Sequence, residues 1–246
     1  MTELTLFEMP DKRVMPVEVL PVSVVEVGAQ GSGRRSRGGH DGTSSRSERS
    51  HFPREVASLC FDLYLRGRRL CLDPFAGWGE RGSAARERGF GYAGFDISQE
   101  SVESARKEYG IENTIADSRT ADFPEHDCLL TCPPYWNLET YGGSGLEEEP
   151  TWESFLIGYE QALRRCVASS TNKAHYCLLV GDWRRDGTYY PLAHETRRIM
   201  YNLGAETIDE VVVSRKDVTK IKVMLPQAIE QGYTVKVHES LLVFRA

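Results

Sequence analysis

The residues best suited to chemistry lie at positions 131–135, with the sequence TCPPY, directly after an apolar segment at 127–130. The apolar segment predicts a short buried strand. Two consecutive prolines cannot continue that strand, because neither has an N–H to donate to a sheet. The chain must therefore leave the sheet in a stiff loop, which presents backbone carbonyl groups beside an aromatic ring. Fixed acceptors next to an aromatic ring are suited to holding an exocyclic amino group on a flat base.

A second pattern, GWGERG at residues 77–82, has the spacing G-x-G-x-x-G between a predicted strand and a predicted helix. Glycines let the backbone turn tightly and approach a ligand closely. Asp96 ends the next predicted strand, where it can bond a ribose hydroxyl. On its own, the pattern indicates a nucleoside-containing cofactor, and NAD-dependent oxidoreductases share it. An oxidoreductase would leave the Pro-Pro-Tyr loop unexplained.

Together, the two patterns resemble the amino-group DNA methyltransferases, which methylate adenine N6 or cytosine N4. In that family a short polar residue followed by Pro-Pro-Tyr is the catalytic motif, and D-P-F-x-G-x-G holds S-adenosylmethionine; residues 73–79 are DPFAGWG. Residues 133–141, 180–184 and 237–244 look like phage and prophage methylases of this group. HFP at 51–53 resembles their motif ahead of the cofactor loop. The resemblance spans about residues 51–246, and it implies a Rossmann-like fold of the methyltransferase type.

The resemblance also implies roles in binding S-adenosylmethionine. Asp73 would lie near the methionine ammonium, and Phe75 would line the methionine end of the site. Asp96 would bond the ribose hydroxyls, and Asp117 would lie near the adenine amino group. No metal site is predicted. The predicted cofactor-binding residues are Asp73, Phe75, Ala76, Gly77, Gly79, Asp96, Ile97 and Asp117.

The implied catalytic residues are Cys132, Pro133, Pro134 and Tyr135. The carbonyl group of Cys132 or of Pro133 would accept hydrogen bonds from the target amino group, which favours a nucleophilic nitrogen. Tyr135 would stack on a base swung out of the duplex. The family usually has Asp, Asn or Ser where this chain has Cys132, and a thiol is a weak acceptor. Thr131 is one candidate for the missing oxygen, and the target base, adenine or cytosine, stays open at this point.

The order of predicted elements indicates the fold class. Strands alternating with helices predict an α/β protein with a doubly wound, mostly parallel, seven-stranded sheet. Ligands bind beyond the carboxyl ends of the strands in such a sheet, which is where the acidic residues and the Pro-Pro-Tyr loop fall. The predicted strands are 70–73, 92–96, 114–117, 127–130, 174–180, 207–213 and 240–244, and the predicted helices are 56–64, 83–88, 101–109, 152–167 and 192–201.

Residues 1–50 are predicted to be an N-terminal appendage to a methyltransferase domain at 51–246. Residues 14–27 form at most a short edge strand. Residues 28–50 are rich in Gly, Ser and Arg, and such a basic segment buries too little apolar surface to fold. It is interpreted as a solvated linker or as a basic arm that contacts phosphates.

The composition sets the expected location. No apolar run approaches the length of a membrane span, which predicts a cytoplasmic or nucleoid-associated protein, or one in the host cytoplasm if it is phage-encoded. The six cysteines form no C-x-x-C pair and are expected to be reduced core thiols.

The predicted partner is double-stranded DNA. The net charge of −6 argues against a protein that coats nucleic acid, although a local basic stripe would be enough for an enzyme that visits DNA. The best candidates for phosphate contacts lie between the last two predicted strands, at Arg215, Lys216, Lys220 and Lys222. An RNA or protein-glutamine N-methyltransferase is an alternative, as is a non-catalytic DNA-binding module, which Cys132 prompts. The oligomeric state, the recognition sequence and a restriction partner stay open.

Overall fold

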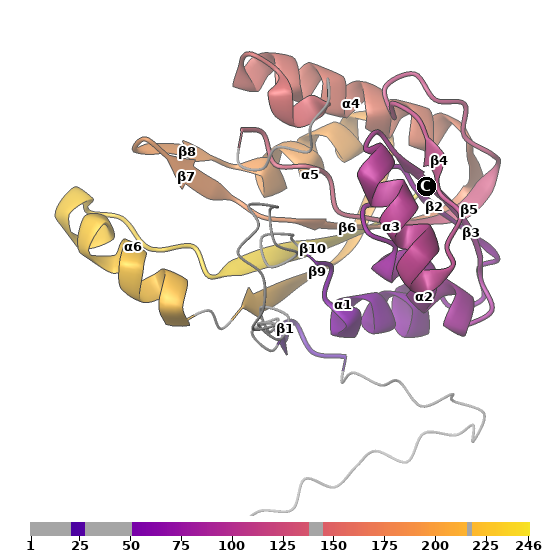
Figure 1. The fold of residues 1–246 in the computed structure, drawn as a ribbon, viewed down its shortest axis with the longest axis horizontal. Coiled ribbons are helices and arrows are strands. Elements are labelled where there is room, and N and C mark those ends of the chain that lie inside the picture. Colours follow the sequence, from indigo (N-terminus) through magenta and orange to yellow (C-terminus); the bar gives the residue numbers. More distant parts are fainter. Residues whose placement is uncertain (1–20, 28–50, 138–144, 216–217) are drawn as a thin grey trace, which may run out of the picture.

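The computed structural model of the protein describes residues 21–27, 51–137, 145–215 and 218–246, with the side chains of 218–220 outside this description. Its centre is an eight-stranded sheet with the order β1-β9-β10-β6-β5-β2-β3-β4 (Figure 1). Strand β10 is antiparallel to both of its neighbours, and all other neighbouring pairs are parallel. The strands are β1 (Val24–Val27), β2 (Leu70–Asp73), β3 (Gly91–Asp96), β4 (Thr114–Ile115), β5 (His126–Thr131), β6 (Ser170–Val180), β9 (Glu206–Arg215) and β10 (His238–Arg245).

The mostly parallel sheet confirms the predicted fold class, but it has eight strands rather than seven. The additional strand is β1, which pairs with the edge of β9. It lies inside the segment predicted to be an appendage, at the place where at most a short edge strand was expected. Residues 28–50 are outside the described part of the chain, so the predicted disorder and basic arm remain predictions.

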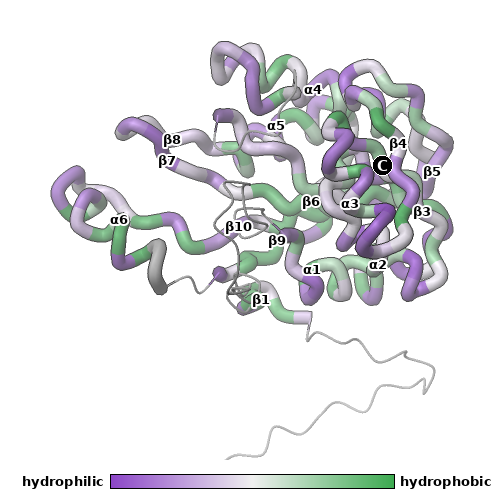
Figure 2. The backbone as a smooth tube through the Cα atoms, viewed as in Figure 1, coloured by the Kyte–Doolittle hydropathy of each residue, from purple (hydrophilic) through white to green (hydrophobic). Residues whose placement is uncertain are grey.

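In the described ranges, helices cover both faces of the sheet, and two separate cores hold most of them in place. One core joins β-strand side chains to α1 (Arg54–Leu59), its π-helical continuation (Cys60–Tyr64) and α2 (Glu80–Glu87). The other joins the opposite face to α4 (Trp152–Ala168) and α5 (Leu192–Asn202). Helix α3 (Gln99–Tyr109) packs beside α2. Figure 2 shows the hydrophobic residues gathered along the central strands between these layers.

Alternation along the strands explains why both faces are apolar. In β5, Cys128 and Leu130 point to the α1 side, whereas Leu129 points to the α4 side. This follows from the two-residue period of a strand, and it requires a continuous apolar run where both faces are covered. Five of the six cysteines are buried and none forms a disulfide, as expected of core thiols, while Cys132 is only partly buried.

The sheet also explains where ligands bind. From β2 the chain proceeds to β3 and β4 on one side, and then to β5 and β6 on the other. The strand order therefore reverses at β2. The connections that follow β2 and β5 lead away in opposite directions and leave a crevice at the carboxyl ends of these two strands. That edge carries the glycine loop after β2 and the Pro-Pro-Tyr loop after β5.

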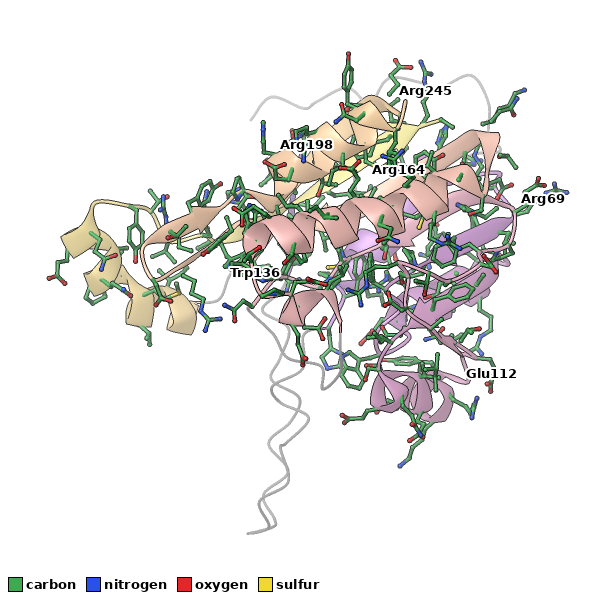
Figure 3. All side chains as sticks on the ribbon, turned by 90° about the horizontal axis from the view of Figure 1, so that it is seen from above. Arg69, Glu112, Trp136, Arg164, Arg198 and Arg245 are labelled. Atoms are coloured by element: carbon green, nitrogen blue, oxygen red, sulfur yellow. The ribbon has the colours of Figure 1, made fainter. Side chains whose placement is uncertain are left out.

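Two projecting elements were not predicted. The first is a hairpin of β7 (Trp183–Arg185) and β8 (Thr188–Tyr190), and the second is α6 (Val218–Gln231). Figures 1 and 3 both show α6 standing apart from the sheet. No helix was predicted between the last two predicted strands, where α6 lies with Pro226 inside it. Because proline normally ends a helix, its presence in this segment argued against predicting α6 from the sequence. Among the helices in the described ranges, none is long and apolar enough to cross a membrane.

Candidate active site

One cavity lies at the carboxyl ends of the strands around β2, and it brings the two predicted groups of residues together. From the predicted cofactor set it is lined by Phe75, Gly77, Asp96, Ile97 and Asp117. From the predicted catalytic set it is lined by Cys132, Pro133, Pro134 and Tyr135. The remaining cofactor candidates, Asp73, Ala76 and Gly79, are not among the lining residues.

The glycines of the loop after β2 have different tasks. Both have positive φ, +55° at Gly77 and +99° at Gly79. A Cβ at Gly79 would lie 2.8 Å from the Cβ of Ala105, so this glycine is required for α3 to pack against the loop. A Cβ at Gly77 would meet a single heavy atom within 4 Å, Nη2 of Arg81 at 3.9 Å, and would project into the cavity. Gly77 therefore opens space for a ligand, whereas Gly79 and the buried Ala76 shape the loop.

Asp73 is fully buried beneath this loop, and protein groups occupy its carboxylate. Its oxygens accept hydrogen bonds from Arg81 Nε at 2.6 Å, Tyr92 Oη at 2.7 Å and Thr131 Oγ1 at 2.7 Å. The side chain thus joins α2, β3 and β5 to the end of β2. It has no exposed surface with which to contact a ligand, so the expectation that Asp73 lies near the methionine ammonium does not fit this arrangement.

The charged group that reaches the cavity from this network is Arg81, which the sequence motifs did not single out. Its Nη2 donates to the carbonyl of Phe75, and its guanidinium lies 4.8 Å from the ring centroid of Phe52. Within the described residues, Nη1 has no hydrogen-bond partner. Burial disfavours the charged form, but the adjacent Asp73 carboxylate raises the pKa of Arg81. A basic residue at the fifth position of G-x-G-x-x-G was the available signal.

Asp96 holds the glycine loop against the end of β3. Its carboxylate accepts hydrogen bonds from Gly77 N at 2.7 Å and from Ser98 N at 2.9 Å. Burial raises its pKa, which these backbone donors partly offset. Each carboxylate oxygen keeps a second lone pair, and Asp96 lines the cavity. It can therefore still accept hydroxyl donors from a ligand.

Asp117 lies in an ion-pair network at the β4 side of the cavity. Although burial opposes ionisation, hydrogen bonds from Arg119 lower the pKa of Asp117. Arg119 also contacts Glu149 Oε1 at 2.7 Å, and the carbonyl of Glu149 accepts from Trp136 Nε1 at 2.7 Å. Trp136 packs against Trp152, with ring centroids 6.0 Å apart, beside the N-terminal end of α4 (Figure 3). Local packing is thus its observed role.

Tyr135 is held at both ends of its side chain. Its hydroxyl donates to Glu239 Oε1 at 2.9 Å, and its ring lies 5.6 Å from that of Trp183 at the base of the hairpin. Glu239 also accepts from Arg215 Nε at 2.6 Å. Glu239 therefore links two side chains that line the cavity, in addition to its place near the start of β10. His238 next to it is exposed.

Cys132 lies beside Tyr135 with its sulfur 3.8 Å from the tyrosine hydroxyl oxygen. Burial, and then the charge of Glu239, raise the pKa of the Cys132 thiol to about 12. The thiol is therefore protonated near neutral pH and is a poor nucleophile. Thr131, the suggested source of a replacement oxygen, is fully buried and donates to Asp73, so it does not take that part.

The four predicted phosphate contacts do not share one location. Arg215 lines the cavity and pairs with Glu239. Lys222 is exposed on α6. Lys216 and the side chain of Lys220 lie outside the described residues. Throughout the described ranges, no group of three or more His, Cys, Asp and Glu residues could hold a metal ion.

Comparison with known proteins identifies the fold but not the family. No protein-family model matches the chain, and no curated protein sequence is detectably similar to it. The putative RNA methyltransferase PH1948 from Pyrococcus horikoshii is a similar solved structure, 13% identical, with a TM-score of 0.51 over 80% of this chain and 86% of that chain. An O-methyltransferase from Brevibacillus brevis, solved with S-adenosyl-L-homocysteine, is 13% identical, with a TM-score of 0.51 over 78% and 71% of the two chains.

The fold is that of the S-adenosylmethionine-dependent methyltransferases. TrmN from Thermus thermophilus also has it, at 18% identity and a TM-score of 0.50, where 79% of this chain spans 49% of the length of TrmN. The [4+2]-cyclase SpnF has it too, at 16% identity and a TM-score of 0.54 over 78% and 80% of the two chains. Because a cyclase shares this fold, the reaction has to be argued from the site.

Proposed function

We propose that the protein transfers a methyl group from S-adenosylmethionine to the exocyclic amino group of adenine (N6) or cytosine (N4) in double-stranded DNA. The observation that carries this proposal is the single cavity lined both by Gly77 and Asp96 and by Pro133, Pro134 and Tyr135. A donor held by the first pair would face an amino group held by the second set. An oxidoreductase would use the first pair alone.

The cavity fits the proposed cofactor. Gly77 leaves the space that a Cβ would fill, and Asp96 keeps free lone pairs for ribose hydroxyls. Asp117 lines the same cavity and follows β4, one strand beyond Asp96, where a nucleoside base would extend. Arg81, rather than Asp73, is the residue placed to hold the cofactor's methionine end, since its Nη1 can bond a carboxylate. The O-methyltransferase of similar fold, which was solved with S-adenosyl-L-homocysteine, supports the same choice of cofactor.

When bound, S-adenosylmethionine supplies a methyl group on a positive sulfur, and its transfer forms one N–C bond, breaks one S–C bond, and leaves a neutral thioether and one released proton. The chain has to align the amino group and make its lone pair available. The carbonyl groups of Cys132 and Pro133 are the acceptors suited to this, and the two prolines fix their direction. The ring of Tyr135, fixed by Glu239 and Trp183, gives the base a surface to stack on.

The projecting elements support a nucleic-acid substrate. The hairpin begins at Trp183, in contact with Tyr135, and carries Arg184 and Arg185. The guanidinium of Arg184 lies 4.7 Å from the ring centroid of Tyr233, which ties the hairpin to the segment after α6. Basic side chains on two elements that extend from the cavity can contact phosphates on either side of a base.

Purified protein incubated with S-adenosylmethionine labelled in its methyl group tests this function. Duplex DNA, RNA and a protein extract serve as alternative acceptors. We expect label in DNA only, and calorimetry should detect binding of S-adenosyl-L-homocysteine but not of NAD. Label in RNA or protein would show that the proposed acceptor is wrong, while methyl transfer from S-adenosylmethionine would still stand. Binding of NAD alone would contradict the proposal.

A further inference from the structure

Arg215 places a guanidinium with a fixed orientation in the cavity. It is the last residue of β9, and its Nε donates to Glu239 Oε2 at 2.6 Å. The other oxygen of the same carboxylate accepts from Tyr135. The side chains of Arg215 and Glu239 are 31% and 12% exposed, so the pair is shielded but open on one side.

The terminal nitrogens of Arg215 are the groups left for a ligand. Throughout the described part of the chain, neither Nη1 nor Nη2 has a hydrogen-bond partner, and Arg215 lines the cavity. Because Nε is held by Glu239, the planar guanidinium cannot rotate freely, and its two terminal nitrogens form a pair of adjacent donors. Such a pair matches a ligand with two neighbouring acceptors.

The sheet order places this guanidinium on the side of the methyl acceptor. Asp96 and Asp117 follow β3 and β4, on one side of the Pro-Pro-Tyr loop after β5. Arg215 and Glu239 lie at β9 and β10, on the other side. Since the nucleoside part of the cofactor is assigned to Asp96, the arginine faces the substrate.

We propose, resting on the proposed DNA methylation, that Arg215 reads the flipped base and that this base is cytosine, methylated at N4. Cytosine has two neighbouring acceptors, N3 and O2, on the edge that carries its amino group. Both can accept from one guanidinium while the amino group meets the Pro-Pro-Tyr carbonyls. Adenine has one acceptor, N1, next to its amino group, followed by a C–H. It would leave one donor of Arg215 unpaired, which a shielded site penalises.

Glu239 acts here as a positioning residue. It fixes the plane of the guanidinium and the ring of Tyr135 through its two oxygens. Its charge also balances that of Arg215, so the cavity does not present an uncompensated positive charge where a sulfonium would bind. The base would then lie between an aromatic surface and a donor pair that are set by the same carboxylate.

The test begins with expression in a host whose DNA carries no methylated bases, followed by nucleoside analysis and sequencing of the DNA. We expect N4-methylcytosine. N6-methyladenine would overturn the assignment of the base and leave the proposed function intact. Absence of any methylated base would overturn both.

The role of Arg215 is tested on a duplex with the site found by sequencing. We expect Arg215→Gln to lower kcat/KM at least tenfold while the affinity for S-adenosyl-L-homocysteine stays the same, which also shows that the variant is folded. Arg164→Gln, on the outer surface of α4 (Figure 3), is the matched control and should have no effect. Replacing the target base by 3-deazacytosine, which lacks the N3 acceptor, should lower kcat/KM far more in the wild type than in the Arg215→Gln variant. An equal cost in both proteins would overturn the contact.

Discussion

The hydroxyl of Tyr135 donates a hydrogen bond to Oε1 of Glu239 across 2.9 Å, joining residues that are 104 positions apart in the chain. This contact connects the Pro-Pro-Tyr loop after β5 to the start of β10. It holds the loop on the side where no strand supports it. The stacking surface for a base is therefore fixed before any substrate binds, which lowers the entropic cost of alignment.

Replacing Tyr135 by Phe keeps the ring and removes this hydrogen bond. We expect kcat on DNA to fall by about three- to tenfold, since a typical hydrogen bond contributes about 0.5 to 1.5 kcal/mol. Tyr135→Ala removes the stacking surface as well and should cost about 10- to 100-fold. Affinity for S-adenosyl-L-homocysteine, measured by calorimetry, should be unchanged in both variants. Equal activity of the Phe and Ala variants would show that the ring is not used.

Cys132→Ser tests whether the thiol takes part as an acceptor or as a nucleophile. A hydroxyl is the stronger acceptor, so we expect the serine variant to be at least as active as the wild type. Complete loss of activity would indicate covalent catalysis by the thiol.

The pH dependence of Cys132 provides an independent check. The pKa of its thiol is raised from an ordinary 9.0 to about 12. A raised pKa keeps the group protonated across pH 7 to 9, and the thiolate forms only as the pH approaches 12. Alkylation of Cys132 by iodoacetamide, which reacts with the thiolate, should therefore be slow, and its rate should keep rising by about tenfold per pH unit from pH 7 to beyond pH 9, with mass spectrometry as the measurement. A rate that levels off near pH 9, the ordinary pKa of a cysteine thiol, would contradict this environment.

Asp73→Asn tests the buried ion pair beneath the glycine loop. Asp73 and Arg81 have side chains that are 0% and 6% exposed, so removal of one charge leaves the other buried and unpaired. We expect a loss of about 3 to 5 kcal/mol in the free energy of unfolding, measured with urea. Glu112→Gln is the control, because Glu112 and its partner Arg106 are 68% and 58% exposed. It should change stability by less than about 1 kcal/mol.

Arg81 is tested by changing the ligand rather than the fold. Removing the carboxylate from S-adenosyl-L-homocysteine should weaken binding to the wild type by about 1.5 to 3 kcal/mol, the contribution of a hydrogen bond to a charged group. Arg81→Gln should bind both ligands with similar affinity, and Arg81→Lys should recover part of the preference. A wild type that does not distinguish the two ligands would exclude Arg81 as the carboxylate ligand.

Salt dependence tests the phosphate contacts predicted for Lys216, Lys220 and Lys222. Neutralising Lys216, Lys220 and Lys222 together should make the slope of log affinity against log salt shallower by about 0.9 for each phosphate that is no longer neutralised. Fluorescence anisotropy with duplex DNA at several salt concentrations measures it. An unchanged slope would show that these lysines neutralise no phosphates. Arg215 is left unchanged in this test because it lines the cavity.

The sequence predicted the central strands well because they are buried on both faces and therefore carry short apolar runs, as residues 128–130 illustrate. It also predicted that Asp96, Asp117 and Tyr135 meet, because carboxyl ends of parallel strands share an edge. It missed α6, where Pro226 interrupts the helical signal, and it missed Arg81. The position of Arg81 in the glycine motif was a signal, but its contact with the buried Asp73, which holds it at the cavity, is defined only by the folded chain.

The burial of Asp73, which was assigned to the cofactor, was not foreseen for a related reason. Position in a motif indicates where a residue lies, but it does not indicate how many neighbours compete for its oxygens. Thr131, Tyr92 and Arg81 come from three different elements, and the fold brings all of them to the same carboxylate.

The most direct measurement of the central claim is transfer of labelled methyl from S-adenosylmethionine to duplex DNA by the wild type and by Pro134→Ala, with S-adenosyl-L-homocysteine affinity measured in parallel. We predict label on an exocyclic amino nitrogen for the wild type, and for the variant a rate that is about 100-fold lower with unchanged cofactor affinity, since the loop supplies alignment and fixed acceptors. Full activity of Pro134→Ala, or label on any other atom of the base, would contradict a cavity in which this loop holds the amino group.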